Sequence, residues 1–392
     1  MKKFSAEKIF DGKNIMKEKV IVTDVEGKIL SIDDSSEHDS SSVNFLSGAI
    51  CPGFINAHCH LELSYMRGRV PKEKGLAQFI RDLLSIRNER MEIVMEEIVK
   101  ADEEMRRNGI VAVGDICNDD HTLNTKSKSK IFYHSFVEAY GFIPANTAKY
   151  FSAALNVFTK AREKNLSASI TPHAPYSVPE ELMKKIFSFS ENEKQIFSIH
   201  NQETEAETQF FANGTGDFTK LLNEFFKLNS SEVFHPTGER SVNYLLKFIP
   251  KEKNVLLVHN TFTSEEEMKN ISNEFSKVYW CTCPRANLYI ENRLPDYKRW
   301  MSVNDRICIG TDSVASNDVL SIFEEMKTIQ QKNSFISTEQ LIQWATINGA
   351  KFLELNDQFG SIEIGKTPGL NLISDLNEKN MLSENSAVRK II

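Results

Sequence analysis

Between about residue 51 and residue 358, short apolar runs alternate with amphipathic segments. Continuous apolar runs of this kind are typical of strands that are buried on both faces of a sheet. In chain order the runs read FINAH, IVAVGDI, IFYHSFVEAY, SASITPHA, QIFSIHN, NVLLVHN, KVYWCTC and RICIGTD. The segments between them repeat apolar residues at helical spacing, most clearly at residues 78–108 and 265–275. The pattern therefore predicts strands that alternate with helices.

Local signals mark the ends of these helices. Thr263 or Ser264 is a candidate N-cap for the helix at 265–275, because a hydroxyl oxygen accepts from the free N–H groups of the first turn. Gly109 is a candidate C-cap for the helix at 78–108. Eight strands that alternate with helices over roughly 300 residues predict an α/β fold, specifically a (β/α)8 TIM-type barrel. A doubly wound open sheet is the alternative.

Both ends of the chain have a different pattern. Residues 1–50 contain short alternating segments separated by Gly, Asp and Ser, and the stretch DDSSEHDSSS reads as a solvated loop. Residues 359–392 repeat this character, with Gly and Pro between apolar pairs. We therefore expect residues 1–50 and 359–392 to build one small β domain together, and residues 51–358 to form the barrel.

Composition and charge narrow the class of protein. A hydrophobic content of 41% is sufficient for a sizeable core. The net charge of −7 and the lack of a basic block argue against a nucleic-acid or anionic-membrane partner. The first residues, MKKFSAEKIFDGKNI, lack the apolar segment of a signal peptide, and no run of about 18 apolar residues is present. We expect a cytoplasmic protein with no membrane contact that binds a small molecule.

The cysteine pattern does not predict a structural metal site. The chain has six cysteines, which lie mostly in the apolar strand-like runs. Cys281 and Cys283 form a single C-x-C pair, which lacks the second pair of a zinc site. We expect reduced thiols in the core.

Histidines recur at the ends of the predicted strands. His58 and His60 are two residues apart in an extended segment, so their side chains point to the same face. Other strand ends carry His173, His200, His259 and Asp312. A barrel gathers the carboxyl ends of its strands at one mouth. Several imidazoles and a carboxylate gathered there suit Zn²⁺ or another borderline divalent cation.

Some polar residues have simpler structural interpretations. We assign hydrogen-bonding roles to His121, His134 and His235. An aspartate at the position of Asp312 often caps the following helix, but Asn317 and Asp318 lie nearer to the start of that helix. We therefore assign Asp312 to the metal.

Six segments carry a resemblance to a known family. In order they read PGFINAHCH, HAPYSVP, HNQETEAE, LVHN, CPRANLYI and GTDSVASN. They resemble the metal-dependent amidohydrolase superfamily, in its branch of nucleobase and nucleoside deaminases and chlorohydrolase-like enzymes, which includes S-adenosylhomocysteine and aminodeoxyfutalosine deaminases. The resemblance covers nearly the whole chain and implies that the terminal segments form a small β-sandwich.

The resemblance also implies the roles of site residues. Its metal ligands correspond to His58, His60, His200 and Asp312, which would hold one divalent ion, with zinc as the first expectation and iron as the second. Catalytic roles fall on Glu203, which matches a proton-shuttling glutamate, on His259, which contacts the bound water or the intermediate, and on Asp312. Glu207 is an alternative to Glu203 on the same helical face.

The implied reaction is hydrolytic deamination. Members of the superfamily with two metals use a carboxylated lysine after strand 4, whereas SASITPHAPYS has none, so a single metal is expected. A metal-activated hydroxide would release ammonia from an aminated N-heterocycle, either a purine-like base or an adenosine-type nucleoside. A related hydrolysis of a chlorinated triazine or a cyclic amide, and a non-catalytic heterocycle-binding protein, are the alternatives.

Four residues are candidates for contact with the substrate: Glu62, His173, Asn287 and Arg240. Residues 214–240 follow the fifth strand and contain several phenylalanines. They are expected either to cover the barrel mouth as a lid or to form a surface excursion with its own small core. A homodimer is a candidate assembly.

Overall fold

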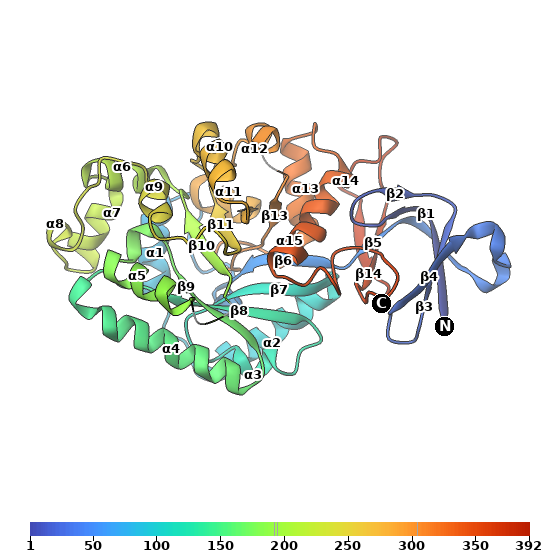
Figure 1. Ribbon diagram of the computed structural model, residues 1–392, viewed down its shortest axis with the longest axis horizontal. Coiled ribbons are helices and arrows are strands. Elements are labelled where there is room, and N and C mark those ends of the chain that lie inside the picture. Colours follow the sequence, from blue (N-terminus) through green and yellow to red (C-terminus); the bar gives the residue numbers. More distant parts are fainter. Residues whose placement is uncertain (192, 194, 304) are drawn as a thin grey trace.

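The computed structural model describes residues 1–191, 193, 195–303 and 305–392. Figure 1 shows three parts along the longest axis of the molecule. A sheet made from both chain ends lies at one end, and parallel strands surrounded by helices lie in the middle. At the opposite end lie the short helices α6 (Glu205–Asn213), α7 (Asp217–Lys220), α8 (Ser230–Val233) and α9 (Ser241–Leu246).

The middle part contains eight parallel strands in two four-stranded sheets. The first sheet has β6 (Phe54–Cys59), β7 (Ile110–Cys117), β8 (Phe132–Ala139) and β9 (Ser167–Pro172) in that order. The second has β10 (Phe197–Asn201), β11 (Val255–His259), β12 (Val278–Thr282) and β13 (Ile307–Ile309) in that order. Spatial order follows chain order in each sheet, whereas a doubly wound sheet reverses its order at a switch point.

The two sheets meet at both of their edges. On one side Cys59 bridges Asp312, and the Thr311 N–H donates to the His58 carbonyl over 3.0 Å. On the other side the His200 N–H donates to the His173 carbonyl over 3.0 Å. The arrangement is therefore of the TIM-barrel type, although the ladder of paired strands does not close into a continuous ring among the described residues.

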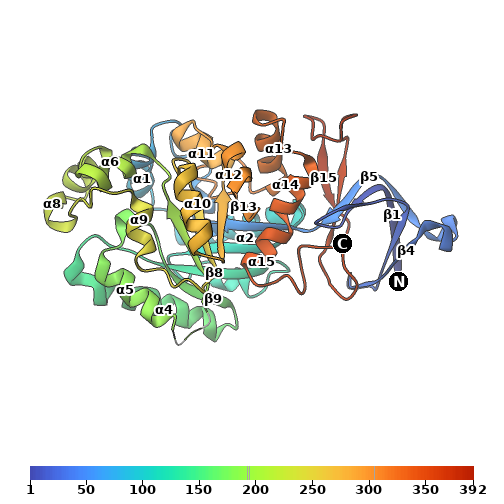
Figure 2. The ribbon, with the colours of Figure 1, turned by 45° about the horizontal axis from the view of Figure 1, so that its top comes forward.

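Helices cover the outer faces of the strands, as Figures 1 and 2 show. They are α2 (Met91–Arg107), α3 (Leu123–Lys126), α4 (Thr147–Glu163), α5 (Glu180–Phe189), α10 (Glu265–Glu274), α11 (Pro284–Glu291), α12 (Tyr297–Val303), α13 (Ile322–Lys332), α14 (Thr338–Ala345) and α15 (Ile347–Phe352). α1 (Leu76–Ser85) packs instead against residues 221–225 and α11.

Helix boundaries corrected two predictions and confirmed one. The single helix expected at 78–108 is two helices, because Arg90 is extended and starts α2 anew. The cap of α13 is Ser321, which accepts from Glu324, and not Asn317 or Asp318 as expected. Ser264 caps α10 as predicted and forms a full capping box with Glu267.

Strands from both ends of the chain share one seven-stranded sheet. Its order is β15 (Ala387–Lys390), β14 (Leu370–Ser374), β5 (Asn44–Pro52), β1 (Lys2–Phe10), β3 (Lys19–Thr23) and β4 (Ile29–Asp34), with β2 (Ile15–Met16) paired to β1. A sandwich has two packed sheets, whereas the described terminal strands form a single sheet.

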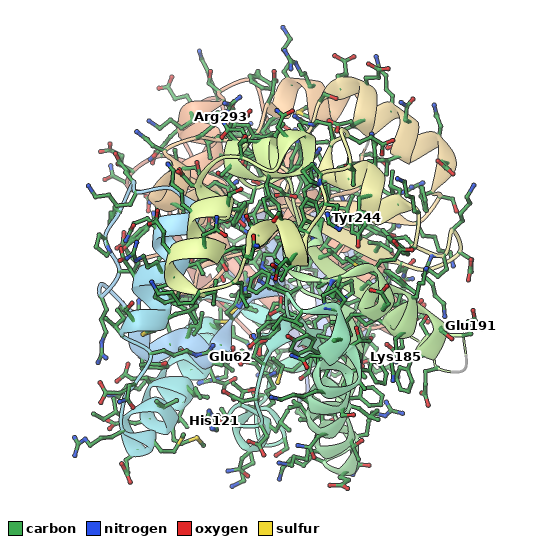
Figure 3. All side chains as sticks on the ribbon, turned by 90° about the vertical axis from the view of Figure 1, so that its left-hand side faces the viewer. Glu62, His121, Lys185, Glu191, Tyr244 and Arg293 are labelled. Carbon is green, nitrogen blue, oxygen red and sulfur yellow. The ribbon has the colours of Figure 1, made fainter. Side chains whose placement is uncertain are left out.

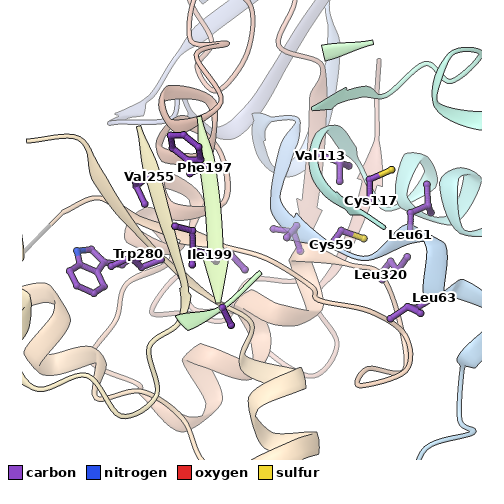
Figure 4. Close-up of a cluster of buried hydrophobic side chains, with 14 of the residues drawn as sticks. Cys59, Leu61, Leu63, Val113, Cys117, Phe197, Ile199, Val255, Trp280 and Leu320 are labelled. Carbon is purple, nitrogen blue, oxygen red and sulfur yellow. The ribbon is translucent and has the colours of Figure 1, made fainter. Parts of the chain in front are cut away.

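The core explains why the strand sequences are apolar without alternation. Phe197, Ile199, Val255 and Trp280 belong to the large cluster that includes the helices, and all are buried (Figure 4). The neighbouring residue Leu256 belongs to a separate cluster with other strand residues. Both faces of these strands are thus covered. All six cysteines are buried and free, as the sequence predicted.

Candidate active site

Four side chains from β6, β10 and the end of β13 converge at the carboxyl ends of the strands. The Nε2 atoms of His58 and His60 lie 3.2 Å apart, and His60 Nε2 is 3.4 Å from His200 Nε2. Asp312 Oδ1 lies 3.3 Å from His60 Nε2 and 3.8 Å from His58 Nε2. The structure therefore brings together the four residues that were predicted to bind the metal.

These separations fit one tetrahedral metal ion. Zinc–imidazole bonds of ~2.0–2.1 Å place the ligand atoms of a tetrahedral site about 3.3 Å apart. The His58–His60, His60–His200, His60–Asp312 and His58–Asp312 separations, at 3.2–3.8 Å, are close to that spacing. Burial lowers the pKa of His58 and His200 well below the usual value, so both rings are neutral and carry the lone pair that a metal needs.

Hydrogen bonds to the atoms of His200 and Asp312 that face away from the cluster fix the orientation of these two side chains. The Nδ1–H of His200 donates to the His173 carbonyl over 2.9 Å. The other ring nitrogen, Nε2, therefore carries the lone pair that can bind a metal. Ser316 Oγ donates to Asp312 Oδ2 over 2.6 Å, so Oδ1 faces the histidines. Similar outer contacts orient metal ligands in many proteins.

The backbone is strained where the strands end. Gln202, His259, Asn260 and Asp312 have φ values of 46°, 70°, 51° and 56°. Such left-handed positions cost of order 1–3 kcal/mol each in residues other than glycine and cluster at functional sites. Of these four residues, His259 and Asp312 line the cavity that opens at the strand ends.

Glu203 and His259 face each other beside the four-residue cluster. Glu203 Oε1 lies 3.7 Å from His259 Nε2, and both side chains are buried. Burial raises the pKa of Glu203 well above the usual value, and Asp312 adds to the shift. α6 begins only at Glu205, so Glu203 reaches the site from the turn after β10 and not from the helical turn that its spacing from His200 suggested.

A cavity of about 300 Å³ opens onto this cluster. Its polar part is formed by His60, His200 and Asp312 of the metal site, by Glu203 and His259, and by Glu62, Arg87, Asn118, Glu138, Tyr140 and His173. Its apolar part includes Phe79, Leu83, Phe142, Phe218, Leu222 and Phe226. The apolar side chains come from α1, from the segment after β8 and from residues 214–240. This last segment therefore supplies part of the cavity wall.

Several polar residues of this wall were not predicted from the sequence, among them Arg87, Asn118 and Glu138. Glu62 was predicted, but its oxygens already accept from the Asn118 N–H (2.7 Å), Asn118 Nδ2 (2.9 Å) and Arg87 Nη2 (3.2 Å). Asn118 Nδ2 also donates to Glu138 Oε2 over 3.0 Å, and burial raises the pKa of Glu138 to about 8. Glu138 lies at the end of β8, so the strand-end rule would have found it.

Two predicted substrate contacts lie elsewhere. Asn287 is buried and does not line the cavity; its Oδ1 accepts from His259 Nδ1 over 2.8 Å, so it orients that ring. Arg240 does not line the cavity either, and its guanidinium binds Glu267, Thr208 and the carbonyl of Phe262. Figure 3 views the end of the molecule that carries α6 to α9, with Glu62 labelled.

Two of the three histidines assigned to hydrogen-bonding roles, His134 and His121, have polar partners. His134 lies between Ser167 Oγ at 2.8 Å and Ser169 Oγ at 2.9 Å, away from the strand ends. His121 pairs with Asp119 at 3.0 Å, and the His235 side chain is exposed. His173 faces the cavity, as predicted, and its Nδ1 is 2.6 Å from Ser177 Oγ.

Comparison with known proteins agrees with this geometry. The sequence model of the amidohydrolase family matches residues 49–391, so the chain belongs to the amidohydrolase family. An adenosine deaminase of Helicobacter pylori is 26% identical over 340 residues, which are 86% of this chain and 81% of that protein. An aminodeoxyfutalosine deaminase of Nitratiruptor sp. is 27% identical over 356 residues, which are 87% of this chain and 81% of that protein.

Solved structures share the fold. An aminofutalosine deaminase of Helicobacter pylori in complex with methylthio-coformycin has a TM-score of 0.83 at 22% identity, with 97% of this chain and 94% of that chain covered. An atrazine chlorohydrolase of Arthrobacter aurescens complexed with zinc has a TM-score of 0.73 at 16% identity, with 95% of this chain and 86% of that chain covered.

Among the described residues no helix has the length and hydropathy needed to cross a bilayer.

Proposed function

We propose that this protein is a metal-dependent hydrolytic deaminase that releases ammonia from an aminated N-heterocycle. One observation carries the proposal. A buried carboxyl group, Glu203, and a buried imidazole, His259, face each other at 3.7 Å beside the histidine–aspartate cluster, at the cavity surface. General acid–base chemistry on a small molecule needs this combination of groups.

His58, His60, His200 and Asp312 would hold one divalent ion. Such an ion lowers the pKa of a bound water from 15.7 to about 7, which supplies hydroxide at neutral pH. Zinc is the proposed metal because the observed ligand spacing suits its tetrahedral geometry. β9 ends at Thr171 and Pro172 without a lysine, which supports a single metal ion.

The chain's own side chains move the protons. Glu203 takes one proton of the attacking water and delivers it to the ring nitrogen. It then takes the proton of the hydroxyl group added to the ring carbon and transfers it to the leaving amine, which departs as ammonia. The Nδ1–H of His259 donates to Asn287, so its Nε2 accepts from one O–H of the same water and leaves the other O–H for Glu203. His173 lies on the cavity wall where it contacts the heterocycle.

Within this class of substrate we propose an adenosine-type nucleoside in place of a free base. Most of the cavity wall is apolar, with side chains from α1, from the segment after β8 and from residues 214–240. This apolar wall suits an apolar substituent on the sugar, and relatives are named as deaminases of adenosine, aminodeoxyfutalosine and 5-methylthioadenosine. We infer that the eight strands work as one closed barrel around this cavity.

The proposal is tested by ammonia release from a panel of substrates. Metal-loaded protein is mixed with adenine, adenosine, 5′-methylthioadenosine, aminodeoxyfutalosine, guanine, cytosine and a pterin. We expect turnover of the purine nucleosides with apolar 5′ substituents above that of the free bases. The likeness to an atrazine chlorohydrolase makes a chlorotriazine the informative comparison. Chloride release without ammonia release from any member would overturn the proposal in favour of a chlorohydrolase.

A further inference from the structure

Arg240 is the last residue before α9, and it links three parts of the chain. Its Nε donates to Glu267 Oε1 over 3.0 Å, and its Nη1 donates to Thr208 Oγ1 of α6 over 3.3 Å. Its Nη2 donates to the carbonyl oxygen of Phe262. One guanidinium group thus joins α10, α6 and the loop that follows His259.

Glu267 is the second part of this connection. The same oxygen that binds Arg240 accepts from Gln202 Nε2 over 2.8 Å, and the other oxygen accepts from the Ser264 N–H over 2.8 Å. The Glu267 side chain is only 11% exposed. A buried carboxylate with three donors is held firmly in place and in turn fixes the side chains that bind it.

Gln202 is the residue that this connection holds, and it lies directly before Glu203. Its φ of 46° is left-handed and strained, so the turn needs support from its surroundings. The Phe262 N–H donates to the Gln202 carbonyl over 3.0 Å, which ties the turn after β10 to the loop after β11. Arg240 supports both residues of this hydrogen bond: it binds the Phe262 carbonyl directly and reaches Gln202 through Glu267.

We propose that Arg240 is a positioning residue that, through Glu267 and Phe262, holds the turn bearing Glu203 against the loop that follows His259. This inference rests on the proposed function, because the two side chains that it aligns are the proposed acid–base pair. A displacement of about 1 Å at such a pair lowers the rate by roughly 10²-fold. The geometry requires the planar fork of an arginine, since a lysine ammonium does not reach all three acceptors at once.

The test compares Arg240→Ala, Arg240→Lys and the control Arg106→Ala. Arg106 has a similarly exposed side chain, 35% against 31%, and pairs with Glu103 inside α2. We expect both Arg240 variants to lose about 10–100-fold in kcat, with KM within about threefold of the wild type and metal content unchanged. Added guanidinium at millimolar concentration is expected to restore kcat to Arg240→Ala and to leave Arg106→Ala unaffected.

A second measurement does not depend on activity. Hydrogen exchange of peptides that span residues 199–204 and 258–264 reports the Phe262 and Glu203 amides, which bond to Gln202 and Glu207. We expect about tenfold faster exchange there in Arg240→Ala and no change in Arg106→Ala. Unchanged exchange, or a kcat equal to that of the wild type, would overturn the inference. If no substrate is turned over but exchange is faster in Arg240→Ala, the positioning role of Arg240 is supported while the proposed function fails.

Discussion

Replacement of Glu203 by glutamine tests the proposed proton transfer. Glutamine has nearly the same shape, and the Glu203 backbone N–H keeps its 3.2 Å bond to Glu207 Oε2. Glu203 is outside the four-residue cluster, so the variant retains the metal. The amide cannot carry a proton between water and the leaving amine, and general acid–base catalysis of this kind contributes about 10²–10⁴-fold. We therefore expect kcat to fall by about that factor, with KM nearly unchanged.

The assay measures ammonia release at saturating substrate, together with metal content by elemental analysis. The matched control is Glu205→Gln, which removes a carboxylate two residues along the chain at an exposed position in the first turn of α6. We expect the control to keep wild-type activity. If Glu203→Gln retained more than about a tenth of the wild-type kcat at full metal loading, the role assigned to Glu203 would be refuted.

Three further predictions concern support for the site. Lys126→Met leaves Asp115 charged and unpaired, since the pair is 2.6 Å apart and fully buried, and is expected to lower the free energy of unfolding by about 3–5 kcal/mol in urea titrations. Asn287→Ala removes the acceptor of His259 Nδ1 and is expected to lower kcat roughly tenfold, with metal content unchanged as the check. Burial raises the pKa of Glu325 to about 8, so the folded state binds an extra proton between the pKa of the unfolded chain and about pH 8. The free energy of unfolding should therefore fall as pH rises from 5 to 8, and less steeply in Glu325→Gln; equal slopes in urea titrations would contradict this.

The barrel pattern was predictable because each strand is buried on both faces. The eight apolar runs correspond to the eight strands β6 to β13. Because parallel strands end on the same side, the residue at the end of each run could be placed at the barrel mouth. The break between α1 and α2 was missed because IRNER contains neither Gly nor Pro, and its extended Arg90 depends on the surrounding structure. A joint β domain of both chain ends was expected, whereas the order of its strands within one sheet depends on contacts distant in sequence.

Residues at strand ends were predictable, whereas residues that act through others were not. His58, His60, His200 and Asp312 converge because parallel strands bring their carboxyl ends to one side. Arg240 was expected to face the substrate, but Glu267 and the Phe262 carbonyl, both distant in sequence, bind its guanidinium. Sequence spacing alone does not reveal such partners.

The most direct test of the central claim is a metal titration of the metal-free protein with ammonia release as the readout. The claim is one divalent ion at a site that requires His60. Activity toward the best purine nucleoside should rise linearly and reach its plateau at one zinc ion per chain, and His60→Ala should bind no zinc at micromolar concentration. A plateau at two ions, or ammonia release by metal-free protein, would contradict the account.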